Sequence, residues 1–163
     1  MVIKVGDQLP DVQLATLGAE GPTKVPLRSL FEGKKGVLVG VPGAFTPGCT
    51  KTHLPGYVAD YQKLKDAGAE VVAVLTVNDP FVAKAWADSA GAEGKVQVLA
   101  DPAGEATKAL GTEWDATAIL GTVRSARFSA VIEDNVVKTF NLEDGGAMTC
   151  SLSNQIIAQL KDA

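Results

Sequence analysis

The stretch that decides the fold class is Gly36-Val37-Leu38-Val39-Gly40-Val41-Pro42-Gly43-Ala44-Phe45-Thr46-Pro47-Gly48-Cys49. Residues 36–41 form a short apolar run that is bounded by glycines and followed by a proline, which predicts a buried strand. Residues 42–48 contain two glycines and two prolines, which predict a fixed loop whose backbone can approach a ligand closely. A helical pattern begins at about Cys49. A strand, a loop and a helix in this order predict an α/β architecture.

The alternation of strands and helices continues along the chain. Apolar runs predict two more central strands, at residues 70–77 and 96–99. Apolar spacing and start signals predict helices at residues 49–66, from after Asp79 to about residue 90, and at 103–110. Pro55 lies inside the first of these helices, so we expect a kink near Leu54.

The C-terminal part of the chain predicts a β-hairpin and a closing helix. Residues 127–132 and 136–140 flank the turn sequence Glu133-Asp134-Asn135. Ser151 or Ser153 can cap a helix that carries Ile156, Ile157 and Leu160 on one face. We find no repeat or polar linker, so residues 1–163 are expected to form a single domain. This order of elements suits a thioredoxin-like α/β fold, with a mixed central sheet flanked by helices on both faces.

Composition excludes several classes of function. A net charge of -4 without clustering of either sign argues against binding to nucleic acid or to an anionic membrane. No apolar run is long enough for a membrane span or a signal peptide, and the last residues are not a peroxisomal address. We therefore expect a cytoplasmic protein, or a mitochondrial one if a transit peptide has been removed. Two cysteines and one histidine are too few for a disulfide scaffold or a Cys/His zinc site.

Cys49 is the candidate reactive group because it lies where a strand end meets the first turn of a helix. Ligands bind at strand ends in α/β sheets, and a helix start points N–H groups outward. The thiolate is the nucleophilic form of cysteine, yet an ordinary thiol is mostly protonated at neutral pH. Lowering the pKa of an ordinary thiol from about 8.5 to about 6 takes roughly 3.4 kcal/mol. A helix terminus supplies only about 0.3 to 1 kcal/mol and at most about 2 kcal/mol. A cation or further hydrogen-bond donors must supply the rest.

Three side chains could provide that help, and each has a plainer alternative. The Thr46 hydroxyl could donate to the thiolate or to a substrate oxygen, but a threonine at this spacing can also cap the helix. Arg127 could supply a fixed charge, or it could be a solvated or ion-paired arginine. His53 lies four residues after Cys49 and hence on the same helix face, where a structural role is as open as a catalytic one.

The motif Pro42-x-x-x-Thr46-x-x-Cys49 resembles the active-site motif of the peroxiredoxin family. The fuller run of residues 40–56 is similar to the peroxiredoxin-5 type, the animal atypical two-cysteine type. The resemblance covers nearly the whole chain. It extends through Val77-Asn78-Asp79-Pro80-Phe81, Leu99-Ala100-Asp101-Pro102, Arg127-Phe128-Ser129 and Thr149-Cys150-Ser151-Leu152.

The resemblance implies a thioredoxin fold and an antioxidant peroxidase that reduces hydrogen peroxide and organic hydroperoxides, with peroxynitrite as a further substrate, without metal or organic cofactor. By position, Cys49 is the peroxidatic cysteine, Thr46, Gly48 and Arg127 bind the peroxide with it, and Pro42 shields the intermediate. Cys150 matches the resolving cysteine, which forms a disulfide with Cys49 that a thioredoxin-like dithiol reduces.

Alternatives to this assignment stay open at the level of sequence. Cys150 could be an inert thiol, although plant type II enzymes place their second cysteine where this chain has Val74, which favours the animal-type cycle. A thioredoxin-like disulfide reductase normally uses Cys-x-x-Cys, and the third position after Cys49 is Thr52. A redox-sensing interaction module could keep the same fold without sustained turnover.

The family resemblance also bears on disulfide formation and on association between copies of the chain. The two cysteines are far apart in sequence, so disulfide formation requires unwinding of the first helix or movement of the Gly145-Gly146 loop. The resemblance suggests a monomer or a weak homodimer formed through the loops near Phe45 and Phe81, whose rings are expected to be exposed.

Overall fold

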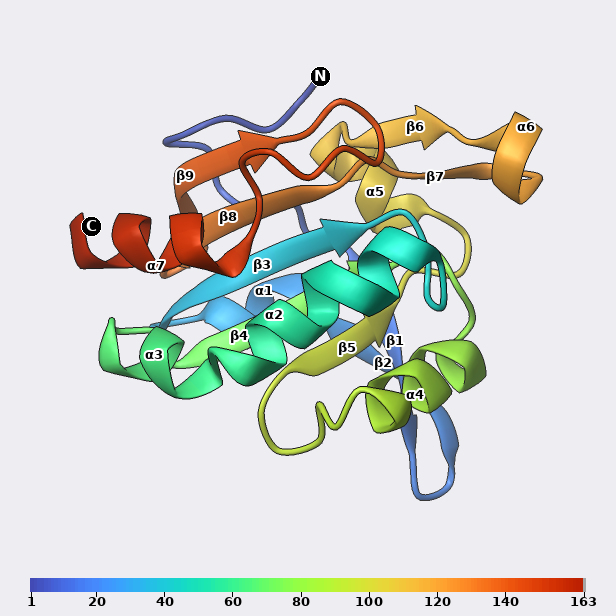
Figure 1. The fold of residues 1–163 in the computed structure, drawn as a ribbon, viewed down its shortest axis with the longest axis horizontal. Coiled ribbons are helices and arrows are strands. Elements are labelled where there is room, and N and C mark those ends of the chain that lie inside the picture. Colours follow the sequence, from blue (N-terminus) through green and yellow to red (C-terminus); the bar gives the residue numbers. More distant parts are fainter. Residues whose placement is uncertain (163) are drawn as a thin grey trace.

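A seven-stranded mixed sheet forms the centre of the computed structural model, which describes residues 1–162 (Figure 1). Across the sheet the strands run in the order β2-β1-β5-β4-β3-β8-β9. The central strands β3, β4 and β5 are parallel to one another, and the other strands pair antiparallel. The strands are β1 (Gln13–Gly18), β2 (Gly21–Pro26), β3 (Lys35–Val41), β4 (Val71–Thr76), β5 (Gln97–Ala100), β8 (Phe128–Glu133) and β9 (Val136–Leu142).

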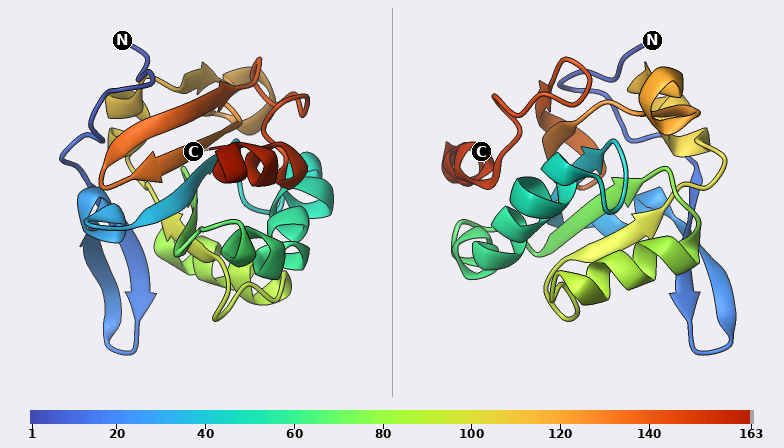
Figure 2. Two further views of the ribbon diagram at one scale, coloured as in Figure 1. Left: turned by 90° about the vertical axis from the view of Figure 1, so that its left-hand side faces the viewer. Right: turned by 45° about the vertical axis from the view of Figure 1, so that its right-hand side comes forward.

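Helices cover both faces of this sheet, as the sequence predicts (Figure 2). One face carries α1 (Leu27–Phe31) and α5 (Glu105–Leu110). The other carries η1 (Cys49–His53), α2 (Leu54–Ala59), α3 (Tyr61–Asp66), α4 (Pro80–Ser89) and α7 (Ser153–Asp162). A separate two-stranded sheet of β6 (Glu113–Asp115) and β7 (Val123–Ser125) is connected by α6 (Thr117–Leu120).

The sheet separates two apolar clusters. Strand β3 contributes Leu38 to the cluster under α1 and α5, and Val37, Val39 and Val41 to the cluster under α2, α3, α4 and α7. Successive strand side chains point to opposite faces, so a strand buried on both sides must be apolar at every position. This is why the run that begins at Gly36 reads as continuous rather than alternating.

The three predicted central strands are confirmed to within about one residue at each end, and the hairpin is confirmed with its second strand ending two residues later than predicted, at Leu142. Helix α4 is also confirmed, with the Asp79 side chain accepting a hydrogen bond from the Val82 N–H at 2.9 Å. Helix α5 begins at Glu105, two residues later than predicted, because the buried Asp101 carboxylate accepts from the N–H groups of Ala106 and Thr107. The sequence analysis missed β1, β2 and the small second sheet, whose strands are short or include exposed polar positions.

The predicted kink at Pro55 takes the form of a π-helical turn. The Leu54 N–H donates to the Cys49 carbonyl across this turn, and the α-helix resumes at Leu54 with Pro55 in its first turn. A proline lacks an N–H and clashes with the carbonyl four residues earlier, so a wider turn accommodates Pro55 without ending the helix. The long predicted helix also breaks a second time, at Asp60 between α2 and α3, which the sequence analysis did not predict.

The predicted closing helix is present as α7, with Ile156 and Leu160 buried and Ile157 half-buried. The expectation that Ser151 or Ser153 caps it is wrong, because Ser153 is its first residue and the first N–H groups donate to the Leu152 carbonyl. The hydroxyls of the two candidate capping serines both donate to carboxylates. Ser153 Oγ donates to Asp60 Oδ2 at 2.7 Å, and Ser151 Oγ donates to Glu143 Oε2 at 2.8 Å. These two serines therefore join α7 and the segment before it to other parts of the fold.

The β8–β9 hairpin turns at Asp134 and Asn135, which have φ angles of 46° and 64°. Asn and Asp adopt this left-handed conformation more readily than most residues, so they suit a two-residue hairpin turn. A register shift between Val131 and Ile132 follows, because Ile132 pairs with Val137 whereas Val131 pairs with Thr139. The extra residue, Lys138, moves every later pairing along β9 by one position.

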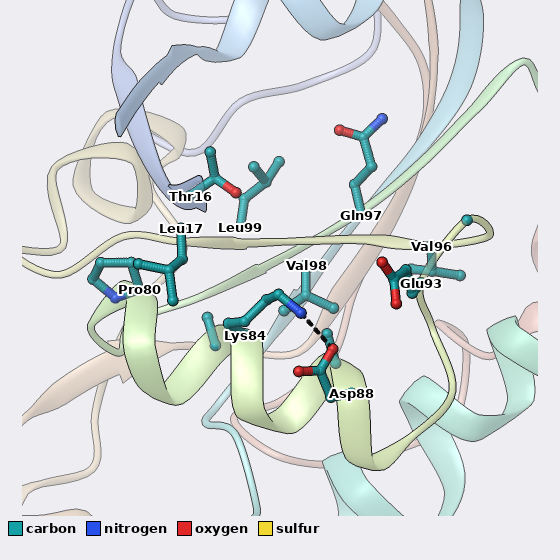
Figure 3. Close-up of a pocket in the computed structure, with 13 residues that line it drawn as sticks. Thr16, Leu17, Pro80, Lys84, Asp88, Glu93, Val96, Gln97, Val98 and Leu99 are labelled. Atoms are coloured by element: carbon teal, nitrogen blue, oxygen red, sulfur yellow. Dashed lines mark hydrogen bonds and ion pairs between the residues drawn. The ribbon is translucent and has the colours of Figure 1, made fainter. Parts of the chain in front are cut away.

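A groove lies between α4 and the strands β1 and β5 (Figure 3). Lys84 Nζ and Asp88 Oδ1 form an ion pair in it at 2.6 Å. None of the site residues predicted from the sequence lines this groove.

Candidate active site

The loop after β3 is held in place by two neighbouring segments. The Ala44 N–H donates to Asn78 Oδ1 at 2.9 Å, so the Val-Asn-Asp block after β4 supports this loop. Trp86 Nε1 on α4 donates to Thr50 Oγ1 at 3.0 Å and fixes the first helical turn from the other side. Phe45, between these anchors, has a φ of 64°, which is uncommon for a residue with a bulky side chain. The surrounding structure therefore fixes the loop in a conformation that its own residues do not favour.

Cys49 lies in the first helical turn, as predicted, and its side chain is completely buried. It begins the π-helical turn η1, and such turns are frequent at functional sites. Both cysteines are free thiols in this structure, Cys49 buried and Cys150 partly exposed. A reactant must therefore reach Cys49 through the side chains that cover the loop.

Thr46 lies close to Cys49, with its hydroxyl directed at the loop backbone. Thr46 Oγ1 donates to the Gly43 carbonyl at 2.7 Å, while the Thr46 carbonyl accepts from the Thr50 N–H at 3.0 Å. The hydroxyl hydrogen is thus in use within the loop, and the oxygen retains lone pairs that can accept a hydrogen bond. The sequence analysis expected this hydroxyl to donate, whereas the resting geometry leaves it as an acceptor.

Arg127 is buried beside the Cys49 turn. Its Nη1 lies 3.0 Å from His53 Nδ1 and its Nε donates to the Gly146 carbonyl at 3.3 Å. A Cβ built on Gly48 would lie 2.9 Å from Arg127 Nη2, so the absence of a side chain at Gly48 lets the guanidinium approach the residue before Cys49. Within residues 1–162, no carboxylate lies within ion-pair distance of Arg127. The alternative of an ion-paired or solvated arginine is therefore wrong.

His53 is a buried neutral imidazole that joins two parts of the site. The pKa of His53 is lowered from 6.5 to about 4, mainly by burial and also by the nearby Arg127 charge, while the hydrogen bond to Ser151 and the Glu143 charge oppose this shift. Because a guanidinium can only donate, Nδ1 accepts from Arg127 and the proton resides on Nε2, which donates to the Ser151 carbonyl at 3.0 Å. His53 therefore orients Arg127 and leaves no free ring nitrogen for acid or base chemistry.

Pro42 lies between the loop and the segment that follows β9. Its ring carbon Cγ would be 3.8 Å from a Cβ on Gly146, and its carbonyl accepts from Arg124 Nη1 at 3.2 Å. Arg124 is a second arginine at this loop that the sequence analysis missed. Its Nη1 would be 2.5 Å from a Cβ on Gly43, and its Nε is buried without a partner among the described residues. The only sequence signal for it was its spacing of three residues from Arg127.

Glu143 is the other residue that the sequence analysis missed. It follows β9 directly, is only 4% exposed, and its backbone N–H donates to the Arg127 carbonyl at 2.8 Å. Its carboxylate accepts hydrogen bonds from residues 149–151, the segment that contains Cys150. Because the Ser151 carbonyl accepts from His53, this segment is also joined to the helix that carries Cys49.

The structure thus joins Arg127, His53 and the segment of Cys150 in one hydrogen-bond network, and it places the Arg127 guanidinium against Gly48, the residue before the buried Cys49. Cysteine thiolates are nucleophiles that small oxidants attack, so a cysteine beside a buried guanidinium is a candidate reactive group. Among residues 1–162, no group of histidine, cysteine and carboxylate side chains could hold a metal ion. The fold and the site together define a thiol-dependent oxidoreductase of the thioredoxin-like class.

Comparisons with known proteins narrow this class. The Redoxin family model matches residues 4–155. Peroxiredoxin-2E, chloroplastic, from Arabidopsis thaliana is 44% identical, over 97% of this chain and 69% of that protein. Reduced Prx3 in complex with H₂O₂ from Vibrio vulnificus is 42% identical with a TM-score of 0.93, over 98% of this chain and 99% of that one. Peroxiredoxin 5 from Alvinella pompejana is 37% identical with a TM-score of 0.88, each chain being covered to 99%.

The chain belongs to the peroxiredoxin family, and it is a thiol peroxidase. The thioredoxin-like fold predicted from the sequence is confirmed. None of the helices in residues 1–162 has the length and apolar character that crossing a membrane requires.

Proposed function

We propose that the protein reduces hydrogen peroxide, organic hydroperoxides and peroxynitrite through a Cys49 sulfenic acid and a Cys49–Cys150 disulfide, which a thioredoxin-like dithiol recycles. The observation that carries this proposal is the buried Arg127 guanidinium beside Gly48, with no carboxylate at ion-pair distance within residues 1–162. An unpaired buried charge costs on the order of several kcal/mol. The Cys49 thiolate is the anion that offsets this cost.

In the first step the Cys49 thiolate attacks the terminal oxygen of the hydroperoxide. A sulfur–oxygen bond forms as the O–O bond breaks; the leaving oxygen of a hydroperoxide takes a proton and departs as water or an alcohol, and that of peroxynitrite departs as nitrite. Negative charge moves from sulfur to the leaving oxygen, where Arg127 and the N–H groups of the helix start stabilise it. Thr46 accepts the O–H of the peroxide, because its own hydrogen is bonded to the Gly43 carbonyl.

Gly48 and Pro42 shape the space around the reacting atoms. Gly48 admits the guanidinium next to the thiolate, since a Cβ there would come within 2.9 Å of Arg127 Nη2. Pro42 lies against the Gly146 loop and shields the sulfenic acid from bulk water. His53 supports the reaction indirectly, by holding Nη1 of Arg127 at 3.0 Å.

In the second step the Cys150 sulfur attacks the Cys49 sulfenic acid, so that a disulfide forms and water leaves. The segment of Cys150 is joined to the Cys49 helix by the His53 to Ser151 hydrogen bond, which supports this pairing over an inert thiol. Val74, where plant type II enzymes have their second cysteine, is completely buried in β4 and cannot resolve the intermediate. We therefore favour the animal-type, peroxiredoxin-5 cycle.

The proposal extends to the domain organisation, the association and the compartment of the protein. Residues 1–163 act as one domain, of which Ala163 lies outside the described residues. Phe45 and Phe81 are 52% and 60% exposed, which supports a monomer that associates weakly through these two loops. A cytoplasmic or mitochondrial compartment stays a prediction.

The test replaces each cysteine by serine in turn and follows peroxide consumption. Cys150→Ser should consume one peroxide at nearly the native rate, because the first step uses only the Cys49 site. It should then fail to turn over with thioredoxin, and further peroxide should add two oxygens to the Cys49 peptide as a sulfinic acid.

Cys49→Ser is the matched control and should not react at all. Full thioredoxin-dependent turnover of Cys150→Ser would overturn the two-cysteine cycle in favour of an external thiol. A rapid first step in the native protein without any turnover would instead support a redox-sensing module.

A further inference from the structure

The carboxylate of Glu143 holds the segment that contains Cys150. Its Oε2 accepts from the N–H groups of Thr149, Cys150 and Ser151 at 2.7, 2.8 and 2.9 Å, and from Ser151 Oγ at 2.8 Å. Its Oε1 accepts from Thr149 Oγ1 at 2.6 Å. Hydrogen bonds to an ionised acceptor are the strong ones. Residues 149–151 are therefore fixed to the end of β9 through a single buried side chain.

The hairpin register explains why Glu143 occupies this position. Phe128 pairs with Leu142, so Arg127 lies across from Glu143, and the Glu143 N–H donates to the Arg127 carbonyl at 2.8 Å. Without the extra residue at Lys138, Arg127 would face Leu142 instead, and the carboxylate would turn to the other side of the strand. The bulge thus places the site arginine and this carboxylate at the same end of the hairpin.

The C-terminal end of the held segment, Ser151, connects to the Cys49 site. The Ser151 carbonyl accepts from His53 Nε2 at 3.0 Å and from the Tyr57 hydroxyl at 2.7 Å. His53 in turn holds Arg127 at 3.0 Å. The resting position of residues 149–151 is therefore the one that keeps Arg127 oriented for the first step.

The same position keeps Cys150 away from the second step. Its thiol donates to the Leu142 carbonyl, with the sulfur 3.8 Å from that oxygen, while Cys49 is completely enclosed. A disulfide needs the two sulfur atoms at about 2.05 Å, so the Cys150 sulfur must leave Leu142 first. Burial raises the pKa of the Cys150 thiol and the Glu143 charge raises it further, which lowers the fraction of the attacking thiolate.

We propose that Glu143 is a positioning residue that restrains Cys150, so that release of residues 149–151 from its carboxylate limits the rate of disulfide formation and sets the lifetime of the Cys49 sulfenic acid. This inference rests on the proposed function, in which Cys150 resolves that acid. The reaction itself is unchanged. The thiol of Cys150 and the sulfenic acid of Cys49 give the disulfide and water, and no further oxidant or reductant is needed.

The restraint has a consequence for overoxidation. A sulfenic acid that waits for Cys150 is exposed to a second peroxide, which converts it to a sulfinic acid. Weaker restraint should therefore reduce the sulfinic product formed per turnover, and this product can be measured independently of the disulfide.

The experiment mixes reduced full-length protein with one equivalent of hydrogen peroxide, quenches with acid at intervals, and follows sulfenic acid, disulfide and sulfinic acid by intact mass. Glu143→Gln keeps the side-chain size but removes the charge, so disulfide formation should be about tenfold faster, as expected when charge-assisted hydrogen bonds become neutral ones. At excess peroxide its sulfinic fraction should fall severalfold. Damage to the fold alone would slow both chemical steps rather than accelerate the second.

Two further variants keep the test decisive. Thr149→Val removes only the hydroxyl that donates to Glu143 Oε1, on an exposed residue, so it should accelerate disulfide formation in the same direction by about threefold even if Glu143→Gln folds poorly. Asp144→Asn is the matched control, because it removes the same charge from the exposed neighbouring residue and should leave the rate native.

The proposed restraint is overturned if the native protein forms the disulfide and both Glu143→Gln and Thr149→Val form it at the native rate or more slowly. That outcome would leave the two-cysteine cycle intact. Acceleration by Asp144→Asn equal to that of Glu143→Gln would also overturn the restraint. Failure of the native protein to form any Cys49–Cys150 disulfide would overturn the assignment of Cys150 itself, and the restraint with it.

Discussion

Replacing Arg127 by glutamine removes a buried positive charge from a site that offers it no carboxylate within residues 1–162. If the guanidinium stabilises the charge that moves from Cys49 to the leaving oxygen, its loss should slow the peroxide step by about 10² to 10³, the effect of removing one preorganised charge-stabilising donor. The amide of glutamine is neutral, so it can restore a hydrogen bond but not the electrostatic stabilisation that the guanidinium charge supplies.

The effect of Arg127→Gln on stability should be small because two changes oppose each other. The His53 ring nitrogen and the Gly146 carbonyl lose their donors, which costs about 1 to 3 kcal/mol for each buried acceptor left unpaired. Removing the guanidinium also removes the cost of burying its charge, which is on the order of several kcal/mol. We expect the free energy of unfolding to change by less than about 2 kcal/mol.

The assay is stopped-flow reaction of the reduced protein with hydrogen peroxide, together with urea unfolding of the same samples. Arg28→Gln is the control, since Arg28 is a partly buried arginine on α1 whose Nε donates to the Leu9 carbonyl at 2.7 Å, outside the site. The reasoning is refuted if Arg127→Gln reacts within about threefold of the native rate, or if its rate falls only in proportion to its stability.

Three further predictions concern the same site. Thr46→Ser should keep most of the rate of the peroxide step in stopped-flow measurements, whereas Thr46→Val should react about tenfold more slowly than Thr46→Ser. The reason is that only the hydroxyl donates to the Gly43 carbonyl and accepts from the peroxide. Equal rates would make Thr46 a packing residue. Gly48→Ala should slow the peroxide step at least about tenfold, because its Cβ would approach Arg127 Nη2 to 2.9 Å and displace it. Gly56→Ala is the control and should react normally, since its Cβ would meet only Ser153 Oγ at 3.5 Å. His53, the single histidine, has a folded-state pKa of about 4 and an unfolded one near 6.5, so the unfolded state binds the extra proton and stability falls as the pH drops through this window. Urea titrations should show a loss of about 1.5 kcal/mol between pH 6.5 and 5 that His53→Gln abolishes, and a flat native profile would contradict the buried neutral imidazole.

The pattern of apolar runs was sufficient to predict the central strands, because a strand buried on both faces must be apolar at each position. The hairpin was predictable for a similar local reason, since Asp134 and Asn135 tolerate the left-handed turn. The strands of the N-terminal hairpin were missed because strand β2 has mostly exposed positions and no apolar run.

The position of the candidate reactive thiol in the loop after the first central strand was also predictable from the sequence. The spacing of Pro42, Thr46 and Cys49 placed the thiol at a strand end and in a first helical turn, because these are local consequences of glycine, proline and helix periodicity. The requirement for a cation beside the thiol followed from the limited strength of a helix terminus. Which arginine supplies it rested on resemblance until the fold placed Arg127 against Gly48.

The long-range partners were decided by the tertiary structure. The protonation state of His53 follows from burial and from Arg127, which is 74 residues away in the sequence. The position of Glu143 depends on a one-residue bulge in β9, and a register shift of this kind leaves no mark in the apolar pattern. The sequence by itself therefore determined the fold class and singled out Cys49 as the candidate reactive cysteine, since both inferences use residues that are adjacent in the chain. Only the folded chain decided how Arg127 and Cys150 are held, because their partners meet through strand pairing and burial across distant segments.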